Sequence, residues 1–576
     1  MEKFNRLNSN IALLLKVFAL RLFPVKSFAQ DGFQQKFTKR CTLFAIMLLS
    51  LISAYAHDFE ENGIYYDKVG DGSCVEVVIG RTSTRGGGWE HHFLEGDVVI
   101  PARTSRGYKV IGIAAGAYCR VSSISLPETL LYIESGAFLY APLTELYIPK
   151  SVTNIEPGAF TSCSRLEKIE VDKGNTVYDS RENSNAIIRT ADNALVVGCV
   201  NTIIPNSIRS IDYKAFIGNS AIKKMVIPNT IMNIGANAFE DCLNLESIVL
   251  PENLTILSDH LFDCCKSLKS IEIPNNVTSI GYATFYKCDS LSCVKFSSNL
   301  REIGEYGFAS CGKLKELNFI SNVTINEGAF EYCGELEKVC FENNIIGGET
   351  QIEAYAFQAC GGLKELILPK NLTRIAQRAF EGCVGLEKII VEEGNSIYES
   401  AEDNNSIMCR TIENGIPIVD LVLANKDAII SPKVHRLAPY AFLYGRCSVI
   451  IPENVLSIQK YSFYGCRSLD DVYMKSSTPP NMTQPASDHG AFYRSDPRVM
   501  TLYVPVGAKE IYSDPTLDWC LFGSIVEWYP SDIEDVCSDE KNIPVEYYNL
   551  QGVKVENPDN GVYIKKQGSR STKVVL

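Results

Sequence analysis

The side chains with the widest chemical potential in this 576-residue chain are its 20 cysteines, which can form disulfides, bind metal ions or act as nucleophiles. Nine of them stand at one place in a repeating pattern, three residues after a phenylalanine: Cys163, Cys242, Cys265, Cys288, Cys311, Cys333, Cys360, Cys383 and Cys466. A cysteine that recurs in phase with an apolar ring is typical of a small buried side chain. We therefore favour buried reduced thiols over a ladder of disulfides, whose connectivity a sequence does not reveal.

Six histidines are the other candidates for catalysis or metal binding. None lies in an H-E-x-x-H motif or accompanies a serine or cysteine nucleophile motif. His91 and His92 are adjacent, so they do not easily face one ion. No paired C-x-x-C motif has zinc-site spacing, and no phosphate-binding glycine motif occurs. We therefore predict a non-enzymatic protein with no catalytic residue, no metal site and no cofactor.

Two acidic segments invite a calcium interpretation. Residues 171–180 (VDKGNTVYDS) realign with residues 391–400 (VEEGNSIYES) at an offset of 220. The acidic and amide side chains in and after them are Asp179, Glu182, Asn183 and Asn185 in the first, and Glu399, Glu402, Asp403 and Asn405 in the second. Their spacing matches no EF-hand loop, which favours solvated turns. A hydrolase module hidden in these inserts has no motif to support it.

A repeat of about 23 residues positions all these side chains. Phe239, Phe262, Phe285 and Phe308 stand 23 residues apart, and Phe330 follows at 22. Around each ring the chain restates one pattern, in which an apolar residue and proline precede Ile-Gly, Ala-Phe, Cys and Leu-x-x-Ile-x-Leu. A fixed period in this range indicates a solenoid, whose units bury their apolar faces only by stacking on neighbours.

The end of each repeat has the alternation of a short strand. Ile248 and Leu250 share one face, Leu245 also faces inward, and Pro251 ends the strand. Successive strands are expected to pair in parallel about 4.8 Å apart. The two inserts are expected to be hairpin-like excursions after a repeat strand, with turn signals at 174–175 and 394–395.

The chain divides into five segments on this pattern. Residues 57–103 lack the repeat and predict a β-rich N-terminal cap. Residues 104–475 form the solenoid, with two similar inserts at 171–203 and 391–430. Residues 476–530 predict a C-terminal cap rich in large aromatic side chains. Residues 531–576 are a polar linker and a small β-appendage.

Residues 1–56 read as an upstream extension followed by a secretory signal peptide. A basic pair precedes the apolar run 41–54, and the Ala-Tyr-Ala that follows predicts cleavage between Ala56 and His57. An uncleaved N-terminal anchor is the alternative. The apolar run is too short to span a bilayer comfortably, so we expect no transmembrane span in the mature chain.

The run IP-x-x-V-x-x-I-G-x-x-A-F-x-x-C-x-x-L-x-x-I-x-L-P resembles the leucine-rich repeat of the BspA-like bacterial surface proteins, across most of residues 110–474. The tail, from Tyr547-Tyr548-Asn549-Leu550-Gln551-Gly552-Val553 to Asn560-Gly561-Val562-Tyr563-Ile564, is similar to the sorting segments of Gram-negative secreted proteins. The resemblance implies a leucine-rich-repeat solenoid with short parallel strands in a curved array. It also implies export, to the medium or to the outer surface of a Gram-negative bacterium. Some members of the family are adhesins.

The outward side chain at the centre of each strand is the candidate contact with a partner. Most of these positions are polar, whereas two pairs are apolar and a tyrosine lies near each end; these residues are Tyr147, Val226, Val249, Ile367, Ile390 and Tyr473. Exposed apolar side chains in a contiguous group favour an interaction surface. The alternative is that β-branched residues occur there because strands prefer them.

Two functional hypotheses follow. The first is an exported, non-enzymatic binding scaffold, such as an adhesin, whose partner is a matrix protein, a glycan or another cell. The second is a structural or self-associating envelope protein without a soluble ligand. Nucleic acid is disfavoured because the net charge is −13 and no basic stripe appears.

Overall fold

The computed structural model describes residues 57–78, 94–116, 120–342, 348–442, 448–482 and 490–529, together with four strands near the C-terminus. The upstream extension, the signal segment with Ala56, the histidine pair 91–92 and most of the linker lie outside the described residues. The elements below belong to one compact unit, which comprises Phe59–Gly80 and Phe93–Leu576.

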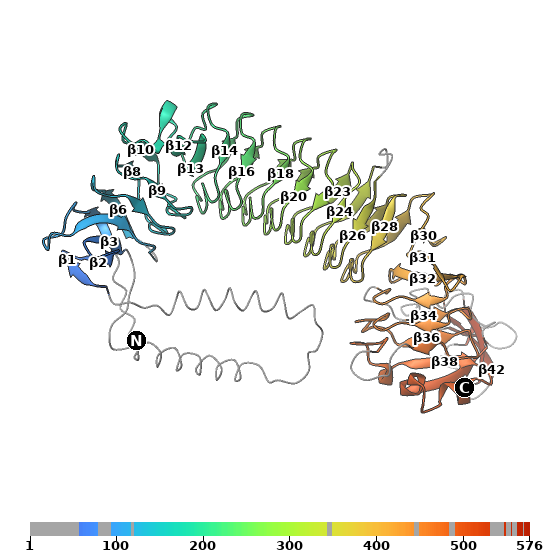
Figure 1. Ribbon diagram of the computed structural model, residues 1–576. Coiled ribbons are helices and arrows are strands. Elements are labelled where there is room, and N and C mark those ends of the chain that lie inside the picture. The colour runs from blue at the N-terminus through green and yellow to red at the C-terminus, as the bar shows by residue number, and fades with distance from the viewer. Residues whose placement is uncertain are drawn as a thin grey trace. The chain divides into compact units, whose positions relative to one another are not determined.

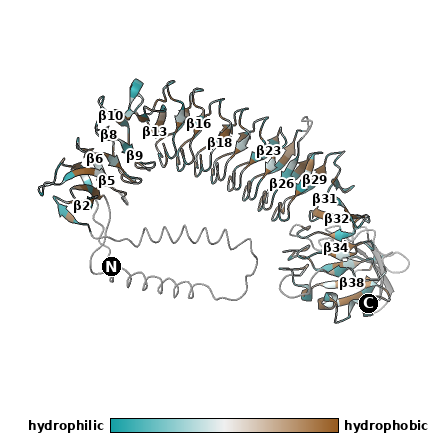
Figure 2. Ribbon diagram, in the orientation of Figure 1, coloured by the Kyte–Doolittle hydropathy of each residue, from teal (hydrophilic) through white to brown (hydrophobic). Residues whose placement is uncertain are grey.

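The chain forms a parallel β-solenoid, in which most coils contribute one longer and one shorter strand (Figure 1). β17 (Ser247–Val249) shows why. Ile248 and Leu250 are buried, Val249 between them is exposed, and Pro251 cannot donate to a sheet. Apolar residues recur along the strands of successive coils (Figure 2), because each strand faces the core with every second side chain. The solenoid expected from the repeat is confirmed.

The longer strands pair in parallel, with residues one repeat apart in register, as Val226 is with Val249. They are β4 (Glu95–Val99), β6 (Arg120–Ser125), β8 (Glu145–Ile148), β10 (Lys168–Val171), β15 (Lys224–Val226), β17, β19 (Ser270–Glu272), β21 (Cys293–Lys295), β23 (Glu316–Phe319), β25 (Lys338–Phe341), β27 (Glu365–Leu368), β29 (Lys388–Val391), β34 (Ser448–Ile451), β36 (Asp471–Met474), β38 (Thr501–Pro505) and β39 (Ser524–Trp528). We call the outward side of these strands the strand face.

The shorter strands stack in parallel on the other side of the coils. They are β5 (Lys109–Ile113), β7 (Tyr132–Ile133), β9 (Asn154–Ile155), β14 (Ser210–Ile211), β16 (Asn233–Ile234), β18 (Ile256–Leu257), β20 (Ser279–Ile280), β22 (Glu302–Ile303), β24 (Thr324–Ile325), β26 (Thr350–Ile352), β28 (Leu372–Ile375), β33 (Arg436–Leu437), β35 (Ser457–Ile458) and β37 (Asn481–Met482). Helix is scarce: η1 (Arg181–Asn183), η2 (Pro497–Val499), α3 (Lys509–Tyr512) and η3 (Asp518–Leu521). Among the described residues, no helix has the length and apolar character needed to cross a bilayer.

The repeat phenylalanines form a column of stacked rings. Phe285 is fully buried, with ring centroids 5.4 Å from Phe262 and 4.7 Å from Phe308. Stacked pairs also run from Phe216 to Phe262, from Phe308 to Phe380, from Phe138 to Phe160 and from Phe442 to Phe492. Tyr118, at the ring position of the first repeat, lies outside the described residues. Each ring fills its own coil and covers the ring of the next, so one substitution affects three coils.

The nine repeat cysteines are buried free thiols, as the phase of the pattern predicted. Their role goes beyond filling space. Cys288 Sγ donates to the Phe262 carbonyl of the preceding coil at 3.2 Å, and Cys311 Sγ does the same to Phe285 at 3.1 Å. The equivalent bond is made by Cys163, Cys242, Cys265, Cys333, Cys360 and Cys383. In a later coil Ser495 takes the same place, and its hydroxyl donates to the Phe463 carbonyl at 2.9 Å. The position three residues after the ring therefore requires a small side chain that can donate a hydrogen bond.

We expect the repeat thiols to be inert in the native protein. Burial raises the pKa of the Cys265 and Cys311 thiols well above the ordinary value, so almost no thiolate is present at neutral pH. Cys293 is exposed and should react with a maleimide before any of the nine repeat thiols, as peptide mapping by mass spectrometry would show. The nine should label only in denaturant. Rapid labelling of Cys288 in the folded chain would contradict the buried column.

The two inserts are hairpins that lie within the stack. The first contains β11 (Tyr178–Asp179), β12 (Ala186–Arg189) and β13 (Ala194–Gly198); the second contains β30 (Tyr398–Ser400), β31 (Ser406–Glu413) and β32 (Ile416–Ala424). β13 and β32 then pair in parallel with the next shorter strands. The expected hairpins are found. The base of each hairpin lies in the stack because side chains on both of its faces are buried there, whereas the outer end of the second hairpin, from Arg410 to Pro417, is largely exposed.

Each hairpin separates two hydrophobic clusters. In the first, Ile188 and Leu195 pack into the central cluster, whereas Ile187 and Val196 pack into the N-terminal one. In the second, Ile407 and Leu423 belong to the central cluster, and Met408 and Leu421 to the C-terminal one. In each hairpin a small residue takes the place of the repeat phenylalanine. The Gly198 and Ala424 N–H groups donate to the carbonyls of Ala215 and Ala441 in the next coil. The repeat phenylalanines make the equivalent backbone bond to the coil that follows them.

Three side chains of the shared insert motif bond to backbone groups. The Asn175 amide donates to the Pro149 and Val152 carbonyls, each at 2.9 Å, and its oxygen accepts from the N–H groups of the two residues at 177–178, also at 2.9 Å. Tyr178 Oη accepts from the Ile155 N–H at 3.1 Å, and Ser180 Oγ accepts from the Val171 N–H. The second insert repeats these bonds with Asn395, Tyr398 and Ser400. The motif thus joins a hairpin to the preceding coil.

Parallel stacking reaches beyond residues 104–475 in both directions. β4, which lies in the segment assigned to the N-terminal cap, pairs in parallel with β6 of the solenoid. β1 (Phe59–Glu61), β2 (Ile64–Val69) and β3 (Cys74–Val78) pair with one another in antiparallel fashion. β38 and β39 extend the strand face at the other end, where Phe522 packs edge-on against Phe492. The tail strands β40 (Glu546–Tyr548), β41 (Lys554–Val555), β42 (Val562–Gln567) and β43 (Arg570–Val575) form an antiparallel sheet.

Candidate binding surface on the strand face

The six residues singled out from the sequence lie on longer strands, at the outward central position. Tyr147 is on β8, Val226 on β15, Val249 on β17, Ile367 on β27, Ile390 on β29 and Tyr473 on β36. The stacking brings Val226 beside Val249 and Ile367 beside Ile390, each one repeat apart in the sheet. Tyr147 and Tyr473 have other residues as their sheet partners. The stacking does not gather all six, because Glu272, Lys295, Asn318 and Cys340 occupy the strands between the two apolar pairs.

The valine pair is the more exposed of the two apolar pairs. Val226 and Val249 are direct partners on β15 and β17, and their exposed fractions are 70% and 57%. The next outward position is Glu272, whose carboxylate pairs with Lys295. The two valines therefore form a small apolar patch beside the ion pair of Glu272 and Lys295.

The isoleucine pair is half-buried and lies beside an ordered carboxylate. Ile367 and Ile390 are partners on β27 and β29. Beside them, Glu365 lies between Lys338 and Lys388, 2.8 Å from the Nζ of each. These two lysines lower the pKa of Glu365 below its ordinary value. The resulting surface combines an apolar step with fixed charges, which is typical of the core and rim of a protein interface.

Tyr473 belongs to a longer apolar row than the sequence indicated. In register, β34, β36, β38 and β39 place Ile450, Tyr473, Tyr503 and Val526 side by side. The Tyr473 ring stacks on Tyr503 with centroids 4.3 Å apart and meets Trp528 edge-on at 5.5 Å. The alternation in Leu502-Tyr503-Val504 was the available signal for this extension.

Tyr147 lies in a polar groove at the other end of the strand face. Its hydroxyl donates to Asp172 Oδ2 at 2.5 Å, a bond that raises the pKa of Tyr147 to about 12. The groove has a volume of about 410 Å³ and is lined by residues that include Ser123, Glu145 and Lys168. Lys168 Nζ lies 3.8 Å from Glu145 and 3.6 Å from Glu170. This polar region is chemically unlike the row around Tyr473.

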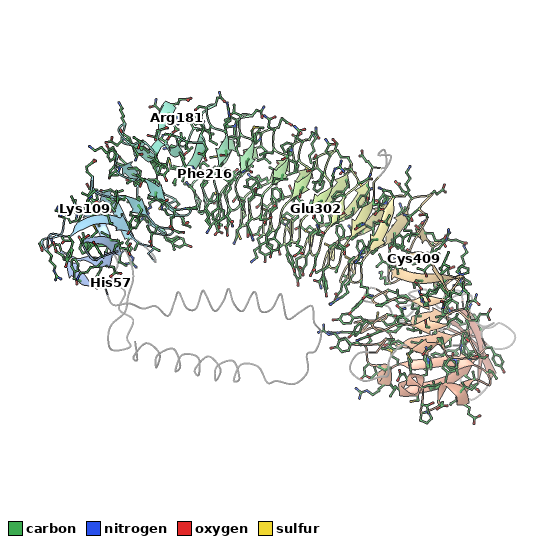
Figure 3. The ribbon with its side chains drawn as sticks, viewed as in Figure 1. His57, Lys109, Arg181, Phe216, Glu302 and Cys409 are labelled. Atoms are coloured by element: carbon green, nitrogen blue, oxygen red, sulfur yellow. The ribbon has the colours of Figure 1, made fainter. Side chains whose placement is uncertain are left out.

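The residues considered for metal binding are engaged elsewhere. Asp179 pairs with Arg181, which Figure 3 labels in the first insert, and Glu182 accepts from the Ser207 hydroxyl at 2.8 Å. In the second insert, Asp403 accepts from the N–H groups of Asn405 and Ile429. Within the described ranges, no group of three or more histidine, cysteine or acidic residues has metal-binding geometry.

His260 lies inside a regular coil. Like Asn237 one repeat earlier, it adopts a positive φ, 53° against 58°. Its Nδ1 lies 2.8 Å from Asp263 Oδ2, and this contact raises the pKa of His260. The pairing stabilises the side chain locally and provides no nucleophile.

The stacked coils, with parallel strands and no catalytic group of residues within the described ranges, define a repeat protein of the leucine-rich solenoid class. The chain belongs to the family of the BspA type leucine-rich repeat region: the family model matches it in six copies over residues 98–192, 198–288, 255–387, 350–420 and 425–495. None of the curated proteins compared with the chain is significantly similar to it.

Solved structures of bacterial leucine-rich-repeat proteins are similar to this chain. A leucine-rich repeat protein from Bacteroides ovatus is 20% identical, with 79% of this chain and 96% of that chain covered and a TM-score of 0.35. A leucine rich cell surface protein from Faecalibacterium prausnitzii is 17% identical, with 83% and 96% covered and a TM-score of 0.29. The pneumococcal vaccine antigen PcpA is 16% identical, with 82% and 98% covered and a TM-score of 0.36.

Proposed function

We propose that this protein is an exported, non-enzymatic scaffold that binds a partner at the bacterial surface, as an adhesin does. The partner is a matrix protein, a glycan or a component of a neighbouring cell. The observation that carries the proposal is the outward apolar row on the strand face from Ile450 to Val526, together with the isoleucine pair. These side chains are held in register by the sheet, so little conformational entropy is lost when a partner binds.

Export itself is part of the proposal. The signal segment and the cleavage between Ala56 and His57 predict secretion or display on the outer surface of a Gram-negative cell. The sorting-like tail supports the same destination. Deleting residues 545–576 should leave the protein in the periplasm, as fractionation followed by immunoblotting would show. Normal surface display of the truncated chain would remove the tail from the proposal.

Substitution of the isoleucine pair tests the surface directly. The double variant Ile367→Ser, Ile390→Ser should weaken binding to immobilised matrix proteins or intact cells by about tenfold or more, because each half-buried apolar side chain contributes of order 1 kcal/mol at an interface. Surface plasmon resonance gives the affinities. A matched control, Glu272→Ser with Lys295→Ser, changes the same outward position on β19 and β21 and should leave binding nearly unchanged.

Two outcomes would count against this assignment. Unchanged binding by the folded isoleucine variant would exclude that pair as a contact. Concentration-dependent assembly of the purified chain in analytical ultracentrifugation, with no binding to any partner, would favour the self-associating envelope protein instead.

A further inference from the structure

The second insert leaves a cavity where the phenylalanine column is interrupted. Ala424 occupies the ring position between Phe380 and Phe442, and a pocket of about 320 Å³ lies beside it. Cys409 on β31, which Figure 3 labels, is one of the residues that line it. The pocket is formed by β28, β31, β32 and β33, so it is separate from the strand face.

The first insert provides an internal comparison. A pocket beside Gly198, where the first insert interrupts the column, has a volume of only about 10 Å³. There the two flanking coils close together: the Ser162 N–H donates to the Ile217 carbonyl at 3.0 Å, and a Cβ atom on Gly218 would lie 2.0 Å from Ser162 Oγ. A hairpin that replaces a ring with a small residue therefore does not by itself leave a large space at that position.

Two mostly buried ion pairs form the polar walls of this pocket. Arg436 binds Asp420 through two bonds of 2.5 and 2.8 Å, and its remaining Nη donates to Glu413 at 2.6 Å. Arg378 Nε donates to Glu381 at 2.6 Å, and the Glu381 side chain is only 9% exposed. An ionic ligand would compete with these pairs and leave one partner buried and unpaired, which is costly. The walls instead suit an uncharged ligand with many hydroxyl groups, because guanidinium N–H groups donate and carboxylate oxygens accept further bonds.

Apolar and aromatic side chains also line the pocket. Phe380 and Leu423 are buried beneath it, and Tyr440 stands at its edge. The Arg378 guanidinium lies 5.0 Å from the centre of the Tyr440 ring and 4.5 Å from that of Tyr355, which fixes the edge in place. A sugar ring has one face of C–H groups and a rim of hydroxyl groups. The pocket presents complementary surfaces to both, and its volume lies at the lower end of the range for small-ligand sites.

We propose that this pocket binds one uncharged sugar unit, with the ring against Phe380, Leu423 and Tyr440 and its hydroxyl groups bonded to the Arg436–Asp420 and Arg378–Glu381 pairs. The site does not depend on the role of the strand face. A protein partner on the strand face and a sugar in the pocket are compatible.

Saturation-transfer NMR on the full chain tests the proposal with defined probes. These are the methyl glycosides of glucose, galactose, mannose, N-acetylglucosamine and N-acetylgalactosamine, with N-acetylneuraminic acid as the charged comparison. At least one neutral glycoside should give a saturable signal. Ala438→Phe, which fills the pocket without removing a polar group, should abolish that signal. Gln459 also lines the pocket. Gln459→Leu, which removes its carboxamide, should weaken binding by about tenfold, the effect of one lost hydrogen bond.

Controls separate this site from the rest of the surface. Ala236→Phe adds the same bulk to a regular coil and should retain full binding, as should the double isoleucine variant of the strand face. If Ala438→Phe does not fold, as judged by circular dichroism, Gln459→Leu decides. Absence of binding to every neutral probe, tighter binding of N-acetylneuraminic acid, or unchanged binding by the folded pocket variants would overturn the proposal.

Discussion

Replacing Phe285 with alanine is expected to lower the free energy of unfolding by about 3–5 kcal/mol. The ring is fully buried and is stacked on both sides, by Phe262 and Phe308. Removing it leaves a cavity that the flanking coils cannot close, because their own rings and backbone bonds fix the spacing between coils. Urea denaturation followed by circular dichroism measures the loss as a lower midpoint.

Two controls make this result specific to the ring column. Phe285→Leu keeps most of the apolar volume and should cost less than half as much. Met232→Ala changes an exposed side chain, 63% accessible, and should shift the midpoint little. Equal effects of Phe285→Ala and Met232→Ala would mean that the column does not stabilise the solenoid as described.

Replacing Asn175 with leucine is expected to cost a similar amount, about 3–5 kcal/mol, through lost hydrogen bonds. The amide satisfies two backbone carbonyls and two backbone N–H groups, and its side chain is buried. Leucine has a similar volume and satisfies none of them. Thermal and urea unfolding of the variant should both show the loss.

The second insert provides the matched comparison. Asn395→Leu removes the same four bonds, but Asn395 is half-buried and one of its amide bonds is longer, 3.3 Å. Water can replace part of what is lost, so the cost should be smaller. Asn253→Leu, which removes one exposed bond to the Asn229 carbonyl, should cost less than 1 kcal/mol. A larger effect at Asn253 than at Asn175 would contradict the structural role given to the motif.

The architecture was accessible from the sequence because its cause is periodic. The 23-residue spacing of the rings and cysteines predicted stacking and buried thiols, and both are found. The hydrogen bond from each thiol was not predicted, because the carbonyl that needs it belongs to the preceding coil. Ser495 was a usable signal, since a hydroxyl in the cysteine slot indicates a donor.

The motif of the inserts shows what local spacing does not reveal. The offset of 220 aligned Asn175 with Asn395 and Tyr178 with Tyr398, and the acidic neighbours favoured solvated turns over a calcium site. The structure uses the amide and phenol groups to bond across coils, a relation that short-range spacing does not contain. The pocket was also beyond reach, because its volume depends on how closely two coils approach.

The candidate surface was predicted in part. The alternation along each strand correctly located the outward positions, including Val249 and Tyr473. It did not locate Ile450 or Tyr503, because the spacing of rings becomes irregular after Phe442. Register across several strands, rather than the pattern in any one of them, determines which outward residues are neighbours.

The two insert hairpins determine where the solenoid can gain or lose coils. Each hairpin buries the side chains of one face in the central hydrophobic cluster and those of its other face in the cluster beyond it. Whole coils can therefore be gained or deleted between the hairpins while the neighbouring blocks keep their own contacts. The number of coils between the hairpins, and with it the length of this block, can therefore change during evolution while the sequences at both ends stay the same.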